Sequence, residues 1–146
     1  MLYLRFTLAG ARFGVPAAAV TAVVPWVALA PLPHAPAGVC GVLNYHGQSV
    51  PVLDLQQLVQ RTPCAPAYGT RIILVSGVTS GLLGLLAETV LDTFRPDSDF
   101  IPSGLPQPDA PYLDGVMFTA DGMVQQINLA GLLPATLQTT LAATGA

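Results

Sequence analysis

Glycine and proline divide this chain into short apolar segments, and that division limits the folds open to it. Fourteen glycines and fourteen prolines are spread over 146 residues, of which 52% are hydrophobic. Proline breaks helix interiors and glycine weakens them, so long helices are disfavoured. The pattern predicts about ten short strands and two short helices in one domain, arranged as small closed or partly open barrels.

The spacing of apolar residues predicts where the strands lie. Residues 2–8 alternate between apolar and polar side chains, which is typical of a half-buried strand. The apolar run at residues 71–75 indicates a strand buried on both faces, and Gly84 indicates a bend or bulge within a later strand. Turns are expected at His46-Gly47 and Asp121-Gly122. We therefore expect strands at residues 2–8, 12–15, 39–45, 48–53, 71–75, 82–90, 112–118 and 123–129.

The remaining segments include the expected helices. Pro16 suits a first helical position and is followed by alanines, so a helix is predicted over residues 17–24. A second short helix is expected at residues 129–141, with one helical turn at residues 55–59. Residues 96–111 are rich in proline and aspartate and are expected to form a long loop.

The distribution of charge limits the classes of partner. The net charge is −3, and the five basic residues are scattered arginines, which argues against nucleic acid and against an anionic membrane surface. Residues 13–53 carry no Asp, Glu, Lys or Arg, but proline interrupts them too often for a membrane-spanning helix. An uncharged surface of this kind is typical of protein contacts. The first residues lack signal-peptide features, so we expect a cytoplasmic protein.

An enzymatic function has little support in the sequence. Cys40 and Cys64 are the only cysteines, and their spacing matches neither a disulfide framework nor a zinc site. We interpret both as reduced thiols, Cys40 packed in the fold and Cys64 in a loop. A site that joins one of them to His34 or His46 is the enzymatic alternative, because a cysteine nucleophile needs a base. No phosphate-binding glycine motif is present, so neither a cofactor nor a metal is expected.

Residues 41–55, GVLNYHGQSVPVLDL, resemble the central signature of the CheW-like family. The matching residues are Gly41, Val42, Asn44, Gly47, Val50, Pro51, Val52, Leu53, Asp54 and Leu55. The opening and closing hairpins resemble the family in the same order, so the resemblance covers nearly the whole chain. Residues 82–88, 100–104 and 110–113 resemble more narrowly the WspB-type adaptors of surface-sensing systems.

The resemblance implies a fold and a function. We expect a mainly β, single domain over residues 1–146, built of two five-stranded SH3-like barrels that meet near residues 60–70, with terminal strands crossing between the lobes. Family members are non-enzymatic adaptors that couple the cytoplasmic tip of a chemoreceptor to the regulatory domain of a CheA-like histidine kinase. We expect the same here, at receptor arrays near the inner membrane, and leave self-association open. A small interaction module outside chemosensing, which differs only in its partner, is the alternative.

Two sets of residues are transferred from the family. The partner-facing set is Val20, Gly41, Asn44, His46 and Gly47, and the structural set is Pro51, Asp54 and Leu55. Core packing is an equal alternative for Val20, and backbone conformation is the alternative for Gly41. Asp54 is expected to accept hydrogen bonds from backbone N–H groups where a strand meets a turn, with a direct partner contact as the alternative.

Two departures from the family fall at expected contact positions. His46 stands where the family usually has arginine, and Ala22 stands where it has an acid. Histidine offers fewer donors than arginine and is mostly neutral near pH 7. We therefore expect a partner surface that relies more on apolar contact.

Overall fold

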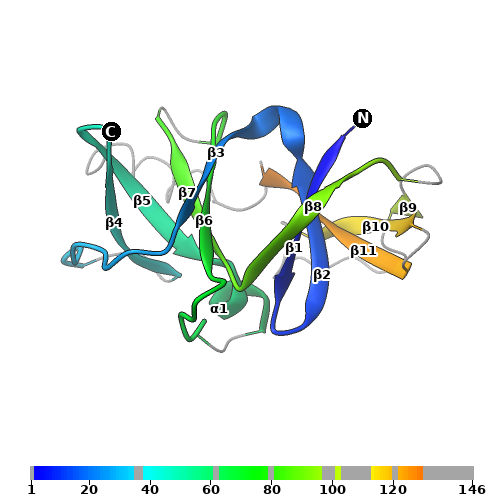
Figure 1. Cartoon of the computed structure of the whole chain (residues 1–146), viewed down its shortest axis with the longest axis horizontal. Coiled ribbons are helices and arrows are strands. Elements are labelled where there is room, and N and C mark those ends of the chain that lie inside the picture. The colour runs from blue at the N-terminus through cyan, green and yellow to red at the C-terminus, as the bar shows by residue number, and fades with distance from the viewer. Residues whose placement is uncertain are drawn as a thin grey trace.

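The computed structural model describes residues 2–34, 38–60, 63–78, 81–96, 101–102, 113–119 and 122–129. Two β-sheets lie side by side in it, and the short helix α1 lies at their junction (Figure 1). The mainly β fold predicted from the sequence is confirmed. The elements are β1 (Tyr3–Leu8), β2 (Ala11–Pro16), η1 (Ala17–Ala19), β3 (Val20–Pro25), β4 (Val39–Tyr45), β5 (Gln48–Asp54), α1 (Leu55–Gln60), β6 (Arg71–Val75), β7 (Leu83–Ala87), β8 (Thr89–Phe94), β9 (Ile101–Pro102), β10 (Leu113–Thr119) and β11 (Gly122–Ile127).

The two sheets draw on different parts of the chain. One has the order β3-β6-β7-β5-β4, and the other has the order β8-β1-β2-β11-β10-β9, with the two-residue β9 as its sixth strand. Strand β2 pairs in parallel with β11, so the N-terminal hairpin is joined to the C-terminal one (Figure 1). Within the described residues each sheet has two outer strands, so both lobes are open rather than closed barrels.

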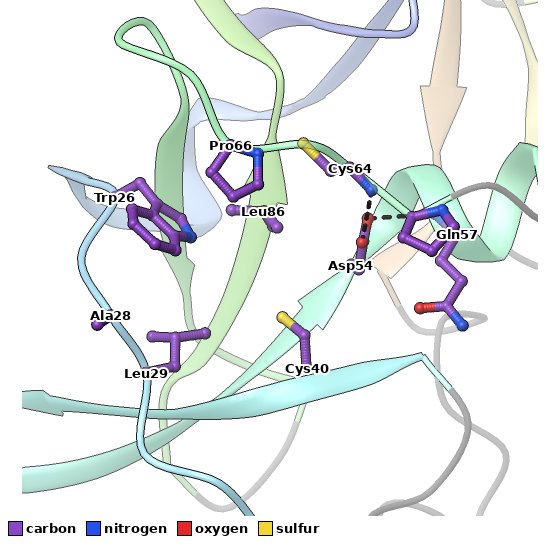
Figure 2. Close-up of a pocket in the computed structure, with 10 residues that line it drawn as sticks. Trp26, Ala28, Leu29, Cys40, Asp54, Gln57, Cys64, Pro66 and Leu86 are labelled. Atoms are coloured by element: carbon purple, nitrogen blue, oxygen red, sulfur yellow. Dashed lines mark hydrogen bonds between the residues drawn. The ribbon is translucent and has the colours of Figure 1, made fainter.

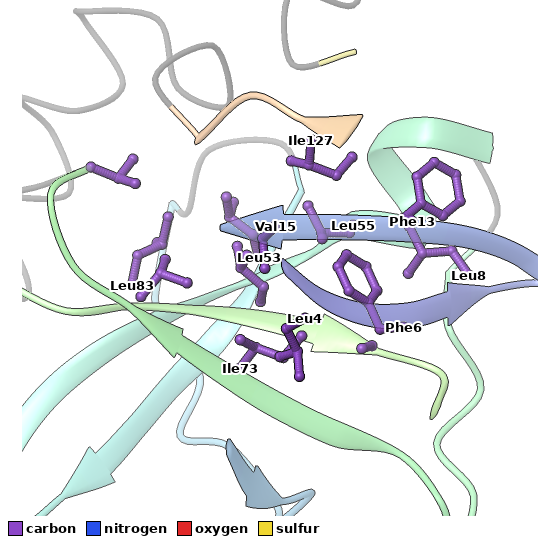
Figure 3. Packing of buried hydrophobic residues seen from close by; sticks show 14 residues of the cluster. Leu4, Phe6, Leu8, Phe13, Val15, Leu53, Leu55, Ile73, Leu83 and Ile127 are labelled. Atoms are coloured by element: carbon purple, nitrogen blue, oxygen red, sulfur yellow. The ribbon is translucent and has the colours of Figure 1, made fainter. Parts of the chain in front are cut away.

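The main core lies between the two sheets and belongs to both. Phe6 of β1 and Phe13 of β2 pack there against Leu53 of β5 and Ile73 of β6, all of them fully or almost fully buried (Figure 3). Alternate residues of the five-stranded sheet point to a second cluster on its opposite face, which includes Ile72. The expected burial of residues 71–75 on both faces is therefore confirmed for residues 72–75.

The predicted helix over residues 17–24 is wrong. Only Ala17–Ala19 form a turn of 3₁₀ helix, and the chain then continues as β3, which pairs antiparallel with β6. The segment contains β-branched residues, including Val20, and these lose side-chain freedom in a helix but pack well on a pleated surface. Its burial alternates with a period of two, as expected for an outer strand with one covered face.

The predicted strand over residues 82–90 is two strands, and the bend lies at Glu88 rather than at Gly84. Strand β7 ends in the five-stranded sheet, and β8 continues in the six-stranded one. Glu88 accepts hydrogen bonds from the Thr7 hydroxyl at 2.9 Å and the Gly10 N–H at 3.1 Å, which holds the change of direction. A Cβ on Gly84 would lie 2.9 Å from a methyl group of Val52, so this glycine allows close packing.

Two other expected elements fall largely outside the described residues. Of the helix expected at residues 129–141, the structure describes Leu129 alone, and of the loop expected at residues 96–111 it describes Pro96 and β9.

Candidate functional site

Three of the expected partner-facing residues lie together at the exposed tip of the β4–β5 hairpin. His46 and Gly47 have φ angles of 51° and 83°, the left-handed pair that a two-residue hairpin turn requires. The Asn44 Oδ1 atom accepts a hydrogen bond from the Gly47 N–H at 2.9 Å. The His46 ring packs edge-on against Tyr45, with 4.3 Å between the ring centroids. This tip presents an imidazole and an amide to the solvent.

Gly41 does not belong to that exposed tip. It is buried in a bulge of β4 with a φ angle of 152°, and residues 26–30 cross over it. A Cβ here would lie 2.7 Å from the Leu29 Cβ atom and 2.9 Å from the Ala30 carbonyl oxygen. The conformational alternative given for this glycine therefore explains it without a partner.

Val20 and Ala22 lie on β3, an outer strand at the other end of the sheet order from β4. Val20 is partly buried and packs against the core between the sheets, whereas Ala22 packs against the cluster on the opposite face. An acid in place of Ala22 would be close to apolar side chains. Strands β6 and β7 therefore lie between these two residues and the β4–β5 hairpin.

The structural residues of the motif are buried where β5 runs into α1. Pro51 is buried within β5, and Leu55 is fully buried in the core between the sheets. Asp54 is only 3% exposed, and its two carboxylate oxygens accept hydrogen bonds from the N–H groups of Gln57 at 3.2 Å and Cys64 at 2.8 Å. It therefore caps α1 and anchors the following loop, as expected from the sequence.

A pocket of about 410 Å³ opens beside this carboxylate, and we call it the Trp26 pocket. Figure 2 shows the Trp26 indole on one side and the thiols of Cys40 and Cys64 with Asp54 on the other. The lining residues are Trp26, Ala28, Leu29, Cys40, Asp54, Gln57, Pro63, Cys64, Pro66 and Leu86. Trp26 was not among the residues expected at a site, although a sole tryptophan in a charge-free stretch is a usable signal.

The expected position of Cys64 in a loop is confirmed, but the expected packing of Cys40 is wrong, because Cys40 is an exposed residue. Cys64 is buried within its loop, because its N–H group bonds to the buried Asp54 carboxylate. The Cys40 thiol nevertheless points inward and donates to the Val52 carbonyl oxygen at 3.5 Å. Burial, and then the Asp54 charge, raise the pKa of Cys40 to about 11, and the same two causes raise the pKa of Cys64.

These raised pKa values predict slow thiol chemistry at Cys40. The pKa of Cys40 is about 11, whereas the ordinary value for a cysteine is 9.0. The thiolate fraction of Cys40 near pH 8 is therefore about 100-fold lower than that of an ordinary cysteine. In a Cys64→Ser variant, alkylation of Cys40 by iodoacetamide at pH 8 should be slower than in the same protein unfolded in urea by about that factor. Equal rates would contradict the raised pKa, and a faster rate in the folded protein would indicate an activated thiol and would favour the Cys–His enzyme. Neither histidine lines the pocket that holds both thiols.

The described part of the chain has no metal-binding cluster. Its residues contain no group of three or more His, Cys, Asp or Glu side chains that could hold a metal ion. They also contain no helix with the length and apolar character needed to cross a bilayer.

Comparisons of the sequence and of the structure with known proteins point to the same family. The profile of the CheW-like domain family matches residues 2–136. Protein FrzA of Myxococcus xanthus is 36% identical over 127 residues, which cover 85% of this chain and 78% of FrzA. The chemotaxis protein CheW of Rhizobium meliloti (strain 1021) is 33% identical over 89 residues, which cover 61% of this chain and 57% of that protein. The scaffolding protein TtCheW from Thermoanaerobacter tengcongensis superposes with a TM-score of 0.80 at 25% identity, over 93% of this chain and 89% of that one.

Proposed function

This chain belongs to the CheW-like domain family, and we propose that it is a chemosensory adaptor that couples a chemoreceptor to a CheA-type histidine kinase without catalysing a reaction. The observation that carries the proposal is the match of nearly the whole chain to the family, in sequence and in fold. The partners would be the regulatory domain of the kinase and the cytoplasmic tip of the receptor. The adaptor would act in the cytoplasm at receptor arrays, and self-association would be secondary to these contacts.

The exposed β4–β5 tip is the part of the described surface best suited to a specific polar contact. Asn44 and His46 are exposed there on a turn that the backbone fixes, so they present donors and acceptors in a defined geometry. The other residues of the proposed partner-facing set are less exposed. Val20 is partly buried and Gly41 is buried, and neither lies at the tip, so any contact they make with a partner is separate from this surface.

The adaptor function is tested by mixing the purified chain with its cognate kinase and a receptor fragment. A complex that co-elutes from size-exclusion chromatography is expected. Separate elution from both partners would contradict the proposal and favour an interaction module outside chemosensing. The genes beside this one would then identify another system, and they would also test the WspB-type assignment.

Replacing His46 with arginine should change partner affinity without unfolding the protein. Arginine restores the fixed charge and the five donors usual in the family, and the side chain lies at an exposed turn. We expect the Kd for receptor or kinase to change by about 3–10-fold, as for a single charged contact of about 1 kcal/mol. Titration calorimetry measures this, and His46→Gln is the matched neutral control. Unchanged affinity in both variants would mean that the turn is only structural.

A further inference from the structure

The Trp26 pocket contains a buried carboxylate without a basic partner among the described residues. Asp54 is 3% exposed and accepts hydrogen bonds from two backbone N–H groups. The ion pair between Arg5 and Asp92, at 3.0 Å, lies in the other sheet. A carboxylate has about four lone-pair positions, so two hydrogen bonds leave it able to accept more. A buried charge of this kind is stabilised further by a cation.

The rest of the pocket also suits a cation, and a flat one in particular. The indole of Trp26 forms one wall, and tryptophan is the aromatic side chain that attracts cations most strongly. The described lining includes no arginine, lysine or histidine that would repel a cation. The Asp54 charge raises the pKa of both Cys40 and Cys64, so its field extends over the pocket.

The surroundings of the pocket indicate a protein as the source of that cation. Pro25, Val27 and Tyr68 are exposed and uncharged, and the Trp26 backbone N–H donates to the Thr70 carbonyl oxygen, which brings this segment beside the Tyr68 loop. The nearby Arg71 guanidinium donates to the carbonyl oxygens of Tyr68 and Thr70 and is not part of the pocket lining. Such a surface around an aromatic anchor is typical of protein interfaces. The volume of about 410 Å³ lies near the lower end of the range for ligand pockets, roughly 300–1,000 Å³, which suits one side chain.

We propose that the Trp26 pocket receives the guanidinium group of an arginine side chain from a partner protein, placed between the Trp26 indole and the Asp54 carboxylate. Guanidinium is preferred to ammonium because it is planar, stacks on aromatic rings, is less strongly hydrated and matches carboxylate oxygens as a fork. The identity of the partner as a receptor or kinase rests on the proposed adaptor function. Guanidinium binding itself does not depend on that function.

The pocket is tested on the full chain with N-acetyl-arginine amide, at constant ionic strength. Trp26 is the sole tryptophan, so its fluorescence reports on the pocket, and the NMR signals of the Gln57 and Cys64 amides report on Asp54. We expect saturable binding with a Kd in the range of about 1–30 mM, since one side chain supplies only a few kcal/mol. The neutral isostere N-acetyl-citrulline amide and choline chloride should each bind at least about tenfold more weakly. Equal binding of citrulline would overturn the role of charge, and equal binding of choline would overturn the guanidinium assignment.

Two variants and one competition complete the test. Trp26→Leu, followed by NMR, should weaken arginine binding by at least about fivefold. Phe118→Leu, at an exposed aromatic residue of β10 in the other sheet, should leave it unchanged. Excess N-acetyl-arginine amide should also lower the affinity of this chain for the co-eluting partner. An unchanged affinity would contradict the proposal that the arginine comes from that partner protein. If neither partner co-elutes but N-acetyl-arginine amide still binds, the proposed adaptor function is contradicted, whereas the preference of the pocket for guanidinium is supported.

Discussion

Replacing Leu53 with alanine is expected to lower the free energy of unfolding by about 2–5 kcal/mol and to destabilise both lobes together. Leu53 is fully buried and belongs to β5 of the five-stranded sheet, but its cluster includes Phe6 and Phe13 of the other sheet. A cavity at this place removes contacts from both sheets at once. Because the largest core is shared, the described residues of neither lobe form an independent apolar interior of comparable size.

Native-state hydrogen exchange measures the effect in each lobe separately. The exchange free energies of slowly exchanging amides in β1 and in β6 should fall by the same amount in the Leu53→Ala protein. Leu91→Ala is the matched control, because Leu91 is exposed on β8 and its truncation should cost less than about 0.5 kcal/mol. Loss of protection in β6 alone would mean that the lobes unfold independently.

Replacing Asp54 with asparagine is expected to cost about 2–4 kcal/mol, although the two side chains have nearly the same shape. Both carboxylate oxygens accept hydrogen bonds from backbone N–H groups, of Gln57 and of Cys64. Asparagine offers one accepting oxygen and an NH₂ group, so one backbone donor would face another donor in a buried place. The start of α1 and the loop that carries Cys64 should both loosen.

Urea denaturation measures the stability, and hydrogen exchange at the Cys64 and Gln57 amides locates the loss. Asn44→Ala is a suitable control, because it also removes a side-chain acceptor from a backbone N–H, but at the exposed hairpin tip. Water replaces that lost bond, so a change of about 0.5–1 kcal/mol is expected. Similar losses in the two variants would contradict the importance of burial at Asp54.

The part of the site that the sequence predicted well is local. The His46-Gly47 turn was expected between two apolar runs, and the structure has it at that place with the left-handed backbone it requires. The backbone hydrogen bonds of Asp54 were also expected, because an acid where a strand ends has few other partners. Whether His46 meets a receptor or a kinase stays a prediction.

The errors arose where a distant segment decides local structure. Residues 20–24 satisfy the pattern of a short helix, but β6 offers them backbone partners along its length, with one irregularity between Val20 and Ala22, and pairing prevailed over local preference. Cys64 was correctly expected in a loop, but its burial was not, because that burial depends on the Asp54 carboxylate, which binds its N–H. Neither outcome depends on the few residues on either side.

The amino-acid sequence by itself determined the mainly β class, the family and the hairpin tip, because alternation, turn residues and a contiguous motif act over short distances along the chain. Only the tertiary structure decided which lobe each strand joins, that one core serves both sheets, and that Trp26, Cys40, Asp54 and Leu86 share a pocket. Those residues come from four separate segments, and strand pairing and burial of apolar surface bring them together. The pocket is a product of that pairing, so no spacing in the sequence encodes it.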